Sequence, residues 1–418
     1  MLIRLLYTLV LFLACPVLLV GLYKKKTGKP TFGSRWKEHW GITPTTQAKN
    51  PIWIHAVSVG ETIAVTPIIK AIKKQNPQQA IVLTTTTSTG AQQAEKLADL
   101  VEHRYMPIDF AWCVKGFLRS VKPTQLLIME TELWPNTLYT VAKSNIPITV
   151  LNARLSEKSC LRYAKFQSIF NLLAKNISQI LCQHEDDAMR FKRLGFASEN
   201  LHVTGSIKFD ISIPSHIMQS SQKLRIELGS ERPTWIAAST HQGEDEILLQ
   251  AHKRLLKLQP NALMILVPRH PERFTAVSEL VQLQKLKAIT RTSQHPPQDD
   301  TQVYIGDTMG EMLLLIGAAD ICFMAGSLLG NKVGGHNLLE PAALAKPLIN
   351  GPSYYNFSDI TQQLLTDNAL VIASTPDEIA EQLNLIFTDT ILSQSMGQAA
   401  LKVVERNRGA LEKTLRYL

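Results

Sequence analysis

The sequence lacks the patterns that would assign a cofactor or a metal. It contains no G-x-x-x-x-G-K-[ST] loop and no G-x-G-x-x-G run, which argues against a P-loop ATPase and a dinucleotide-binding enzyme. There is no D-x-D pair to hold a divalent ion against a diphosphate, and the His and Cys spacings offer no zinc site. The five cysteines are scattered without a C-x-x-C pair, which argues against a disulfide framework and fits a reducing compartment.

The composition indicates a folded, basic protein of two domains. Apolar residues make up 45% of the chain and charged residues 19%, and no low-complexity run interrupts it. A chain of 418 residues exceeds one ordinary core and suits two domains of about 150–200 residues each. The net charge of +9 implies an anionic partner, for which nucleic acid, a membrane surface and a phosphorylated substrate are the alternatives.

The N-terminal segment predicts a membrane anchor. Leu5–Tyr23 is an uncharged, apolar run, just long enough for a bilayer core of ~30 Å, and Lys24–Lys26 follow it at once. A cleaved signal peptide carries its basic residues before the apolar run, whereas Arg4 is the only leading charge here. We therefore expect an uncleaved anchor, with the lysines and the following domains in the cytoplasm. A helix in the interface plane is the alternative, because Pro16 and the marginal length weaken a full span.

The stretch 24–40 extends the membrane interpretation. Its basic residues are interleaved with Trp36 and Trp40, and basic side chains beside amphipathic indoles suit anionic lipid headgroups. A solvated linker is the alternative for this stretch. The basic residues are Lys24, Lys25, Lys26, Lys29, Arg35 and Lys37.

From residue 51 the pattern alternates apolar runs of strand length with runs of helical length. Such alternation predicts parallel sheets covered on both faces. The expected fold class is therefore α/β, with two doubly wound Rossmann-like domains that face a cleft. The expected strands are 52–56, 80–85, 125–130, 148–152, 179–183 and 201–204 in the first series, and 235–238, 263–267, 302–305, 321–325, 347–350 and 369–372 in the second.

Serines and prolines interrupt the pattern after residue 210 and indicate a linker there. The last part of the chain is mostly helical, and we expect it to pack back toward the first domain. The predicted parts are a membrane anchor at 1–23, an N-terminal Rossmann-like domain at 24–210, a linker at 211–232, a C-terminal Rossmann-like domain at 233–385, and C-terminal helices at 386–418.

A candidate catalytic residue lies in the stretch Trp53–Glu61, which reads WIHAVSVGE. An aromatic and β-branched strand breaks at Ser58 and Gly60, and Glu61 then opens a helical run. A carboxylate in the first turn lies at the positive end of the helix dipole, which favours its ionised form. At the carboxyl edge of a sheet, that form suits a general base. An ordinary helix-start acid is the alternative for Glu61, and Ser58 and Gly60 are further candidates.

Two more strand ends in the first series carry charged candidates. Glu130 and Glu132 follow a buried-looking strand at positions i and i+2, so in an extended chain they share one face. A capping or ion-pair role is the alternative, and we assign it first to Glu132. Lys208 follows the last strand of the series, where a lysine can meet a phosphate or a developing negative charge. A plain surface lysine is the alternative there.

Strand ends in the second series carry residues suited to an anion. Arg269 and His270 precede a new helix, where a basic side chain and backbone amides can cradle a phosphate. Paired glycines at 334–335 let backbone amides approach a ligand. Asn337 and Glu340 have the spacing of a capping box, which is the alternative for these two residues. Other candidates in these loops are Ser239, Thr240, Pro268, Met309, Gly310, Glu311, Gly334, Gly335 and His336.

Taken together, these blocks resemble the 3-deoxy-D-manno-octulosonic acid (Kdo) transferases of Gram-negative bacteria, GT-B glycosyltransferases of lipid A biosynthesis. The resemblance runs from the anchor to the final helix. It is carried by HAVSVGE (55–61), METELWPN (129–136), NARLSEKS (152–159), TGSIKFD (204–210), STHQGE (239–244), LVPRHPERF (266–274), GDTMGE (306–311) and GGHNLLEPAA (334–343).

The resemblance implies a function and roles for residues. It implies inverting transfer of Kdo from CMP-Kdo to a lipid A precursor, lipid IVA, with release of CMP, on the cytoplasmic face of the inner membrane in lipopolysaccharide synthesis. It implies that the N-terminal domain takes the acceptor and the C-terminal domain the donor, with anionic membrane lipids as partners, no nucleic acid, no cofactor and no bound metal. Glu61 falls on the family's catalytic base, and Glu130 and Lys208 on residues that stabilise the transition state. CMP contacts fall on Pro268, Arg269, Met309, Gly310, Glu311, Asn337, Leu338, Leu339 and Glu340.

Two alternatives to this function are open at the level of sequence. One is another membrane-associated GT-B enzyme that uses a sugar nucleotide, such as a lipid A disaccharide synthase or a sugar-nucleotide epimerase. The other is a non-catalytic carbohydrate-binding protein. Turnover of UDP-sugars in place of CMP-Kdo would support the first, and an unimpaired Glu61→Gln variant would support the second.

Overall fold

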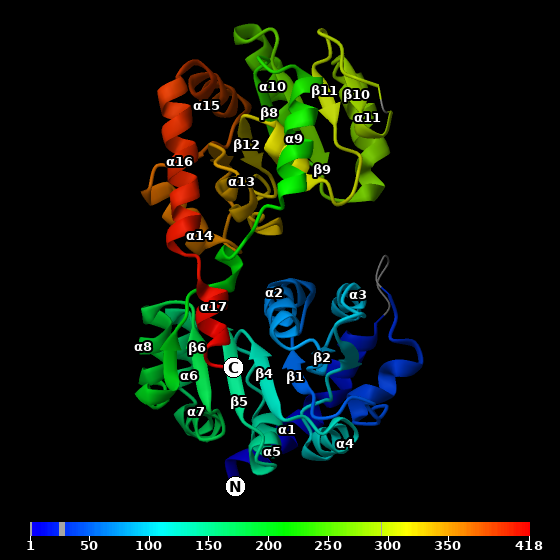
Figure 1. Ribbon diagram of the computed structural model, residues 1–418, viewed down its shortest axis with the longest axis vertical. Coiled ribbons are helices and arrows are strands. Elements are labelled where there is room, and N and C mark those ends of the chain that lie inside the picture. The colour runs from blue at the N-terminus through cyan, green and yellow to red at the C-terminus, as the bar shows by residue number, and fades with distance from the viewer. Residues whose placement is uncertain (1, 25–29, 294) are drawn as a thin grey trace. The chain divides into compact units, whose positions relative to one another are not determined.

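The computed structural model of the protein describes residues 2–24, 30–293 and 295–418 (Figure 1). The chain divides into two compact units: unit 1 comprises Met1–Lys208 and Arg408–Leu418, and unit 2 comprises Phe209–Asn407. Lys25, Lys26 and Lys29 of the predicted basic cluster lie outside the described residues.

Unit 1 is built on a parallel sheet of seven strands in the order β3-β2-β1-β4-β5-β6-β7. Its inner strands are apolar on both faces, as expected where helices cover both sides of a parallel sheet. On one face Trp53 packs against Phe117, with ring centroids 4.4 Å apart, while Ile54 belongs to the core on the other face. The strands are β1 (Ile52–His55), β2 (Ile81–Thr85), β3 (Glu102–Tyr105), β4 (Gln125–Met129), β5 (Ile148–Ala153), β6 (Gln179–Cys182) and β7 (Leu201–Val203).

The helices of unit 1 begin at polar residues that follow the strands. Ser58 is the N-cap of α2, and its side chain accepts a hydrogen bond from the Glu61 amide. Thr87 caps α3 in the same way, accepting from Gly90. The helices are α2 (Val59–Gln75), α3 (Ser88–Glu95), α4 (Ala111–Val121), α5 (Pro135–Lys143), α6 (Glu157–Ala164), α7 (Gln167–Ala174), α8 (Glu185–Arg193) and α17 (Ala410–Leu415), with 3₁₀ turns η1 (Gly33–Trp40), η2 (Ser198–Asn200) and η3 (Ile207–Phe209), the last at the boundary between the units.

Unit 2 repeats the plan with a second parallel seven-stranded sheet, in the order β10-β11-β9-β8-β12-β13-β14. Its strands are β8 (Thr234–Thr240), β9 (Leu263–Pro268), β10 (Ala288–Thr290), β11 (Val303–Ile305), β12 (Ile321–Met324), β13 (Leu348–Asn350) and β14 (Leu370–Ile372). Its helices are α9 (Ser215–Leu228), α10 (Asp245–Leu258), α11 (Phe274–Leu283), α12 (Met312–Ala318), α13 (Leu339–Ala343), α14 (Ser358–Thr366), α15 (Pro376–Thr388) and α16 (Thr390–Arg406), with 3₁₀ turns η4 (Pro271–Arg273), η5 (Arg291–Ser293) and η6 (Gly330–Lys332). The predicted α/β class with two Rossmann-like sheets is confirmed.

The predicted linker at 211–232 is wrong in its main part. Most of it is α9, which packs on unit 2 through buried Leu224 and Leu228. Ser221, which suggested a flexible linker, is buried and donates to the Leu314 carbonyl at 3.0 Å. Serine is therefore a poor linker signal where it alternates with leucines at helical spacing.

The C-terminal part of the chain is shared between the units. The predicted helical tail at 386–418 includes α16, which belongs to unit 2, and only Arg408–Leu418 belongs to unit 1. There Ala410 is buried in the core beneath α2, and the Tyr417 ring stacks on His202 with centroids 4.3 Å apart. The boundary between the units thus falls after α16 rather than before it.

The N-terminal helix α1 (Leu2–Tyr23) is long and apolar enough to cross a membrane, and an 18-residue window within it has a mean hydropathy of 2.6. One face lies against unit 1, where Leu11 and Cys15 are buried with Phe110 and Cys113. Polar groups join the same face: Asn136 Nδ2 donates to Thr8 Oγ1 at 2.9 Å. The opposite face exposes apolar side chains, among them Leu5, Leu6, Leu9, Leu13, Val17, Leu18 and Val20.

Candidate active site

Glu61 is held at the junction of β1 and α2, in unit 1. Its Oε2 accepts a hydrogen bond from the Val57 amide at 2.6 Å, and its Oε1 accepts one from Ser58 Oγ at 3.3 Å. Gly60 lies in the first turn between them. The carboxylate therefore supports the start of α2, as expected for an ordinary helix-start acid. Its pKa decides whether it can also act as a general base.

The pKa of Glu61 is raised to about 7. Burial is the largest cause; the hydrogen bond from Val57 opposes it, and the charges of Glu130 and Glu132 raise the pKa further. The helix dipole favours the ionised form, but desolvation and two neighbouring carboxylates outweigh it. A carboxyl group that titrates near neutral pH can take a proton from a hydroxyl group and release it again, which is what a general base requires.

Glu130 and Lys208 form an ion pair in the same part of unit 1. Lys208 Nζ lies 3.0 Å from Glu130 Oε1. Glu130 follows β4 with a φ of +57°, a left-handed conformation that is uncommon outside glycine and recurs at functional sites. Asn152, at the end of the neighbouring strand β5, accepts the Ile207 amide through Oδ1 at 3.1 Å and so holds the residue before Lys208. The structure thus brings the charged candidates of the first series together.

Glu132 does not have the capping or ion-pair role that was expected for it. We assigned it an ion pair or a cap first, but within the described part of the chain it forms no salt bridge. Burial raises its pKa, a side-chain hydrogen bond with Trp134 opposes this, and the charge of Glu130 adds to it. Glu132 is therefore a third carboxyl group of the Glu61 site rather than a capping residue.

In unit 2, Arg269 follows Pro268 at the end of β9 and is exposed. Its amide donates to the Thr240 carbonyl at 3.0 Å, which joins it to the end of β8. The neighbouring Arg273 is paired with the buried Asp245, whereas Arg269 has no ion pair among the residues that the structure describes. The charge of Arg269 is therefore available to an anion.

Three histidines surround this position. His241 and His336 stack with Nε2 atoms 2.9 Å apart, and His270 lies edge-on to His241 with ring centroids 5.4 Å apart. Burial and the charge of Arg269 lower the pKa of His336 to about 4, so its imidazole is neutral at pH 7. The imidazole groups can donate or accept hydrogen bonds, while Arg269 supplies the positive charge.

Glu340 belongs to the same group. Burial raises the pKa of its carboxyl group, and the charge of Arg269 opposes the shift. The capping box proposed for Asn337 and Glu340 is wrong, because α13 begins at Leu339 with Leu338 as its N-cap. Asn337 Oδ1 instead accepts the Leu339 amide at 3.1 Å. The Glu340 carboxyl group is thus not used at the helix start.

The loop after β12 passes close to His336 and depends on glycine. Gly326 has a φ of +72°, and a Cβ there would lie 2.6 Å from His336 Cδ2. Its carbonyl accepts the Gly335 amide at 2.9 Å, which fixes the paired glycines Gly334 and Gly335. Ser239, at the end of β8, is buried with a φ of +61°. Close contacts and positive φ angles therefore fix the backbone conformation of the loops around Arg269.

Met309, Gly310 and Glu311 form a separate group in unit 2. Met309 and Glu311 line a cavity of about 1010 Å³ together with Arg291. Arg291 makes two hydrogen bonds to the Glu311 carboxylate, at 3.1 and 3.2 Å, and this pairing lowers the pKa of Glu311. The described contacts connect these residues to Arg291 and do not connect them to the Arg269–Glu340 group.

The buried residue Glu244 is important for the donor-side loops, and motif analysis did not single it out. Its carboxylate is fully buried and accepts the amides of Gly326 at 2.7 Å and of Ser327 and Leu328 at 3.0 Å each. It also accepts the His241 amide at 3.0 Å. The only signal in the sequence was its place at the end of the block STHQGE.

We expect Glu244→Gln to lower the free energy of unfolding by about 3 kcal/mol, because the amide NH₂ would face buried N–H donors that need an acceptor. Urea unfolding followed by circular dichroism measures this effect. Glu246→Gln, two residues away on the exposed face of α10, is the matched control. Equal stability of the two variants would contradict the role given to Glu244.

Among the described residues, no group of three His, Cys, Asp or Glu side chains is placed to hold a metal ion.

The family model described as "3-Deoxy-D-manno-octulosonic-acid transferase (kdotransferase)" matches residues 34–211. The 3-deoxy-D-manno-octulosonic acid transferase of Haemophilus influenzae is 38% identical over 421 residues, which cover 99% of this chain and 98% of the relative. The enzyme of the same name from Bordetella pertussis is 31% identical over 380 residues, covering 87% of this chain and 86% of the relative.

Among solved structures, the chain is similar to a UDP-GlcNAc 2-epimerase from Neisseria meningitidis bound to UDP-GlcNAc. The TM-score is 0.56 at 14% sequence identity, over 88% of this chain and 100% of the epimerase. At this identity the likeness concerns the fold alone, and it places the two Rossmann-like units in the GT-B class.

Proposed function

The chain belongs to the 3-deoxy-D-manno-octulosonic acid (Kdo) transferase family, and from this premise we propose that it transfers Kdo from CMP-Kdo to lipid IVA with inversion. The observation that carries the proposal is Glu61, whose pKa is raised to about 7 beside the Glu130–Lys208 pair. A single displacement needs one base and no covalent enzyme intermediate, and Glu61 supplies that base.

In the proposed reaction, the ionised Glu61 takes the proton of an acceptor hydroxyl as its oxygen attacks the anomeric carbon of Kdo. The bond between that carbon and the phosphate oxygen of CMP breaks, and CMP leaves with the bonding electrons. Attack from the face opposite the leaving group inverts the anomeric centre. Lys208, oriented by Glu130, stabilises the negative charge of the transition state.

Unit 2 is proposed to bind the donor. The exposed Arg269 meets the phosphate of CMP, and the imidazoles around it offer hydrogen bonds. Glu340, once ionised beside Arg269, accepts hydrogen bonds from ribose hydroxyls. The other proposed CMP contacts are Pro268, Met309, Gly310, Glu311, Asn337, Leu338 and Leu339. Further candidate site residues, with no contact to CMP assigned, are Ser58, Gly60, Ser239, Thr240, His270, Gly334, Gly335 and His336.

Unit 1 is proposed to take the acceptor at the cytoplasmic face of the inner membrane. The exposed apolar face of α1, the net charge of +9 and the exposed indole of Trp36 support attachment to anionic lipids. Both the acceptor and the attachment site would then lie in the same unit.

Mass analysis of products tests the proposed substrates. With CMP-Kdo and a tetra-acylated lipid A precursor, we expect an acceptor enlarged by Kdo and free CMP, and no turnover of UDP-sugars. The activity should persist in excess EDTA, because charged side chains and not a metal are proposed to stabilise the leaving group. Turnover of UDP-sugars alone would support a different GT-B enzyme, and loss of transfer in EDTA would contradict the metal-independent mechanism.

A further inference from the structure

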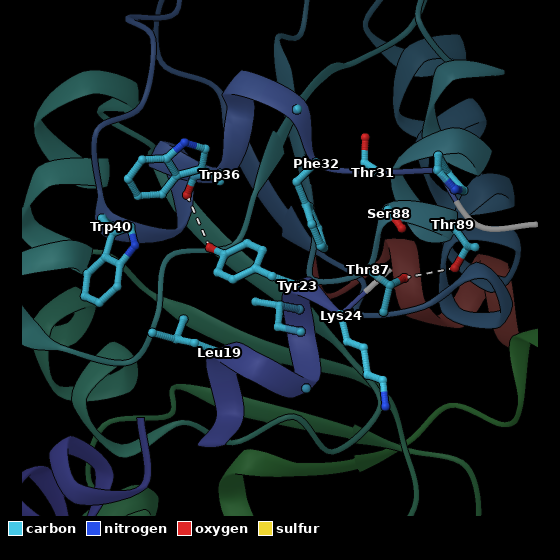
Figure 2. Close-up of a pocket in the computed structure, with 14 residues that line it drawn as sticks. Leu19, Tyr23, Lys24, Thr31, Phe32, Trp36, Trp40, Thr87, Ser88 and Thr89 are labelled. Carbon is cyan, nitrogen blue, oxygen red and sulfur yellow. Dashed lines mark hydrogen bonds between the residues drawn. The ribbon is translucent and has the colours of Figure 1, made fainter. Parts of the chain in front are cut away.

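A cavity of about 630 Å³ lies in unit 1 between the end of α1, the 3₁₀ turn η1 and the start of α3 (Figure 2). Its volume falls in the range of pockets that bind small molecules, about 300–1,000 Å³. Leu19, Leu22, Phe32, Trp36 and Trp40 are apolar residues of its wall. The proposed chemistry uses none of these residues.

The wall is fixed by contacts between aromatic side chains. The Tyr23 hydroxyl and His39 Nδ1 are 2.8 Å apart, and the Phe32 ring packs edge-on against both Tyr23 and His39, with centroid distances of 5.4 and 5.0 Å. Trp40 stacks on Trp112, with centroids 5.8 Å apart. These contacts tie α1 and η1 to each other and to the body of unit 1, so the cavity is built into the fold.

The lining has an apolar side and a polar side. Figure 2 shows Trp36 and Trp40 on one side, and Thr87, Ser88 and Thr89 with Lys24 on the other. A ligand that matches both sides has an apolar chain and a head group that can accept hydrogen bonds and face a positive charge.

The polar side is connected to the proposed base. The Thr87 amide donates to the Val57 carbonyl at 3.3 Å, and the Val57 amide donates to Glu61 Oε2 at 2.6 Å. An amphiphile with its chain in the cavity therefore has its head group near the loop that holds Glu61. A glycolipid acceptor must place its sugar head group beside Glu61 in order to react, whereas a bulk membrane lipid has no reacting group to place there.

The apolar side continues onto the membrane-facing surface. Leu19 and Leu22 line the cavity, and the neighbouring Leu18 and Val20 are exposed on α1. The indole of Trp36 is 45% exposed at the rim. A chain can therefore pass from the bilayer into the cavity along α1 without crossing a polar surface.

We propose that this cavity binds one acyl chain of the lipid acceptor and, through Lys24 and the hydroxyl groups of residues 87–89, directs its sugar-phosphate head toward Glu61. The proposal rests on the proposed function and deepens it, because it makes an acyl chain a determinant of acceptor recognition. It predicts that acylation of the acceptor acts on KM rather than on the chemical step.

A substitution that fills the cavity tests the proposal. Leu22→Trp should raise the KM for the tetra-acylated acceptor at least tenfold, while the KM for the deacylated disaccharide bisphosphate and the KM for CMP-Kdo stay unchanged. Leu13→Trp introduces the same side chain on the exposed face of α1, outside the cavity lining, and should leave every KM unchanged. An unchanged KM in Leu22→Trp, or an equal rise for the acylated and deacylated acceptors, would overturn the proposal.

A binding measurement separates this inference from the function on which it rests. In excess unbrominated detergent and without donor, an acceptor with brominated acyl chains should quench tryptophan fluorescence saturably, and the Trp36→Phe, Trp40→Phe double variant should lose that quenching. Quenching with no turnover in the wild-type protein would overturn the function and leave the cavity assigned. Turnover without quenching, or equal quenching by a brominated phosphatidylethanolamine at the same mole fraction, would overturn the cavity assignment alone.

Discussion

Replacing Glu61 with glutamine is expected to lower kcat for Kdo transfer by about 10²–10⁴-fold, the usual contribution of a general base. Glutamine keeps the size of the side chain and one carbonyl oxygen that can accept the Val57 amide, so the start of α2 should survive. It cannot take up a proton. Transfer assays with CMP-Kdo and the tetra-acylated acceptor measure the loss.

Two controls distinguish the loss of a catalytic base from a disturbance of the fold. CMP binding, followed by calorimetry, should be unchanged, because the proposed CMP contacts are all in unit 2. Glu199→Gln, the same change at an exposed glutamate of η2, should keep full activity. A Glu61→Gln enzyme with wild-type kcat would rule out Glu61 as the base and favour a non-catalytic role for this helix start.

The pH dependence of kcat/KM should show an acid limb with an apparent pKa near 7. Because a base must be unprotonated when the substrate arrives, activity is present above this pKa and falls as the pH drops through it. Two pH units below the pKa the ionised fraction is about 1%, so we expect kcat/KM at pH 5 to be roughly a hundredfold below its plateau. Initial rates in buffers of constant ionic strength measure the limb.

The cause of that pKa can be tested with a second variant. Glu130→Gln removes a negative charge that raises the pKa of Glu61, so the acid limb should move to lower pH even if the rate falls. Burial, the largest cause, is unchanged by this substitution, and the limb should therefore remain above the ordinary range of a glutamate. A limb that does not move in Glu130→Gln, or that moves upward, would show that the limb reports another group.

The strands that sequence could predict were those that carry an apolar run. Each apolar run predicted as a strand is confirmed to within a residue or two at its ends. The two strands that were not predicted, β3 (EHRY) and β10 (AIT), are the outer strands of their sheets. An edge strand packs less of its surface and tolerates polar residues or a short length, so it need not carry an apolar run to detect. Hydrophobic pattern finds the strands that carry an apolar run, the edge strands β7 and β14 among them, and misses the edge strands that lack one.

The candidate site was predictable where it lies at strand ends, and not where it depends on distant contacts. Glu61, Glu130 and Lys208 each follow a strand, and the structure places the latter two in contact. Glu244 holds amides 82 to 84 positions away, and no local pattern reveals such a contact. The pKa of Glu61 was expected in the wrong direction for the same reason, because burial and the carboxyl groups of the β4 end act on it through space.

The packing of α1 divides a single apolar helix into two surfaces that tolerate different substitutions. On the inner surface Thr8, Leu11 and Cys15 must fit protein atoms at fixed positions. On the outer surface Leu13 and Val17 need only remain apolar. Over evolutionary time the outer positions should exchange freely among leucine, valine, isoleucine and phenylalanine, while the inner ones change only together with their neighbours in unit 1. If α1 attaches the protein to the membrane as proposed, an apolar helix grafted from an unrelated membrane protein would restore the attachment but not the packing of α1 on unit 1.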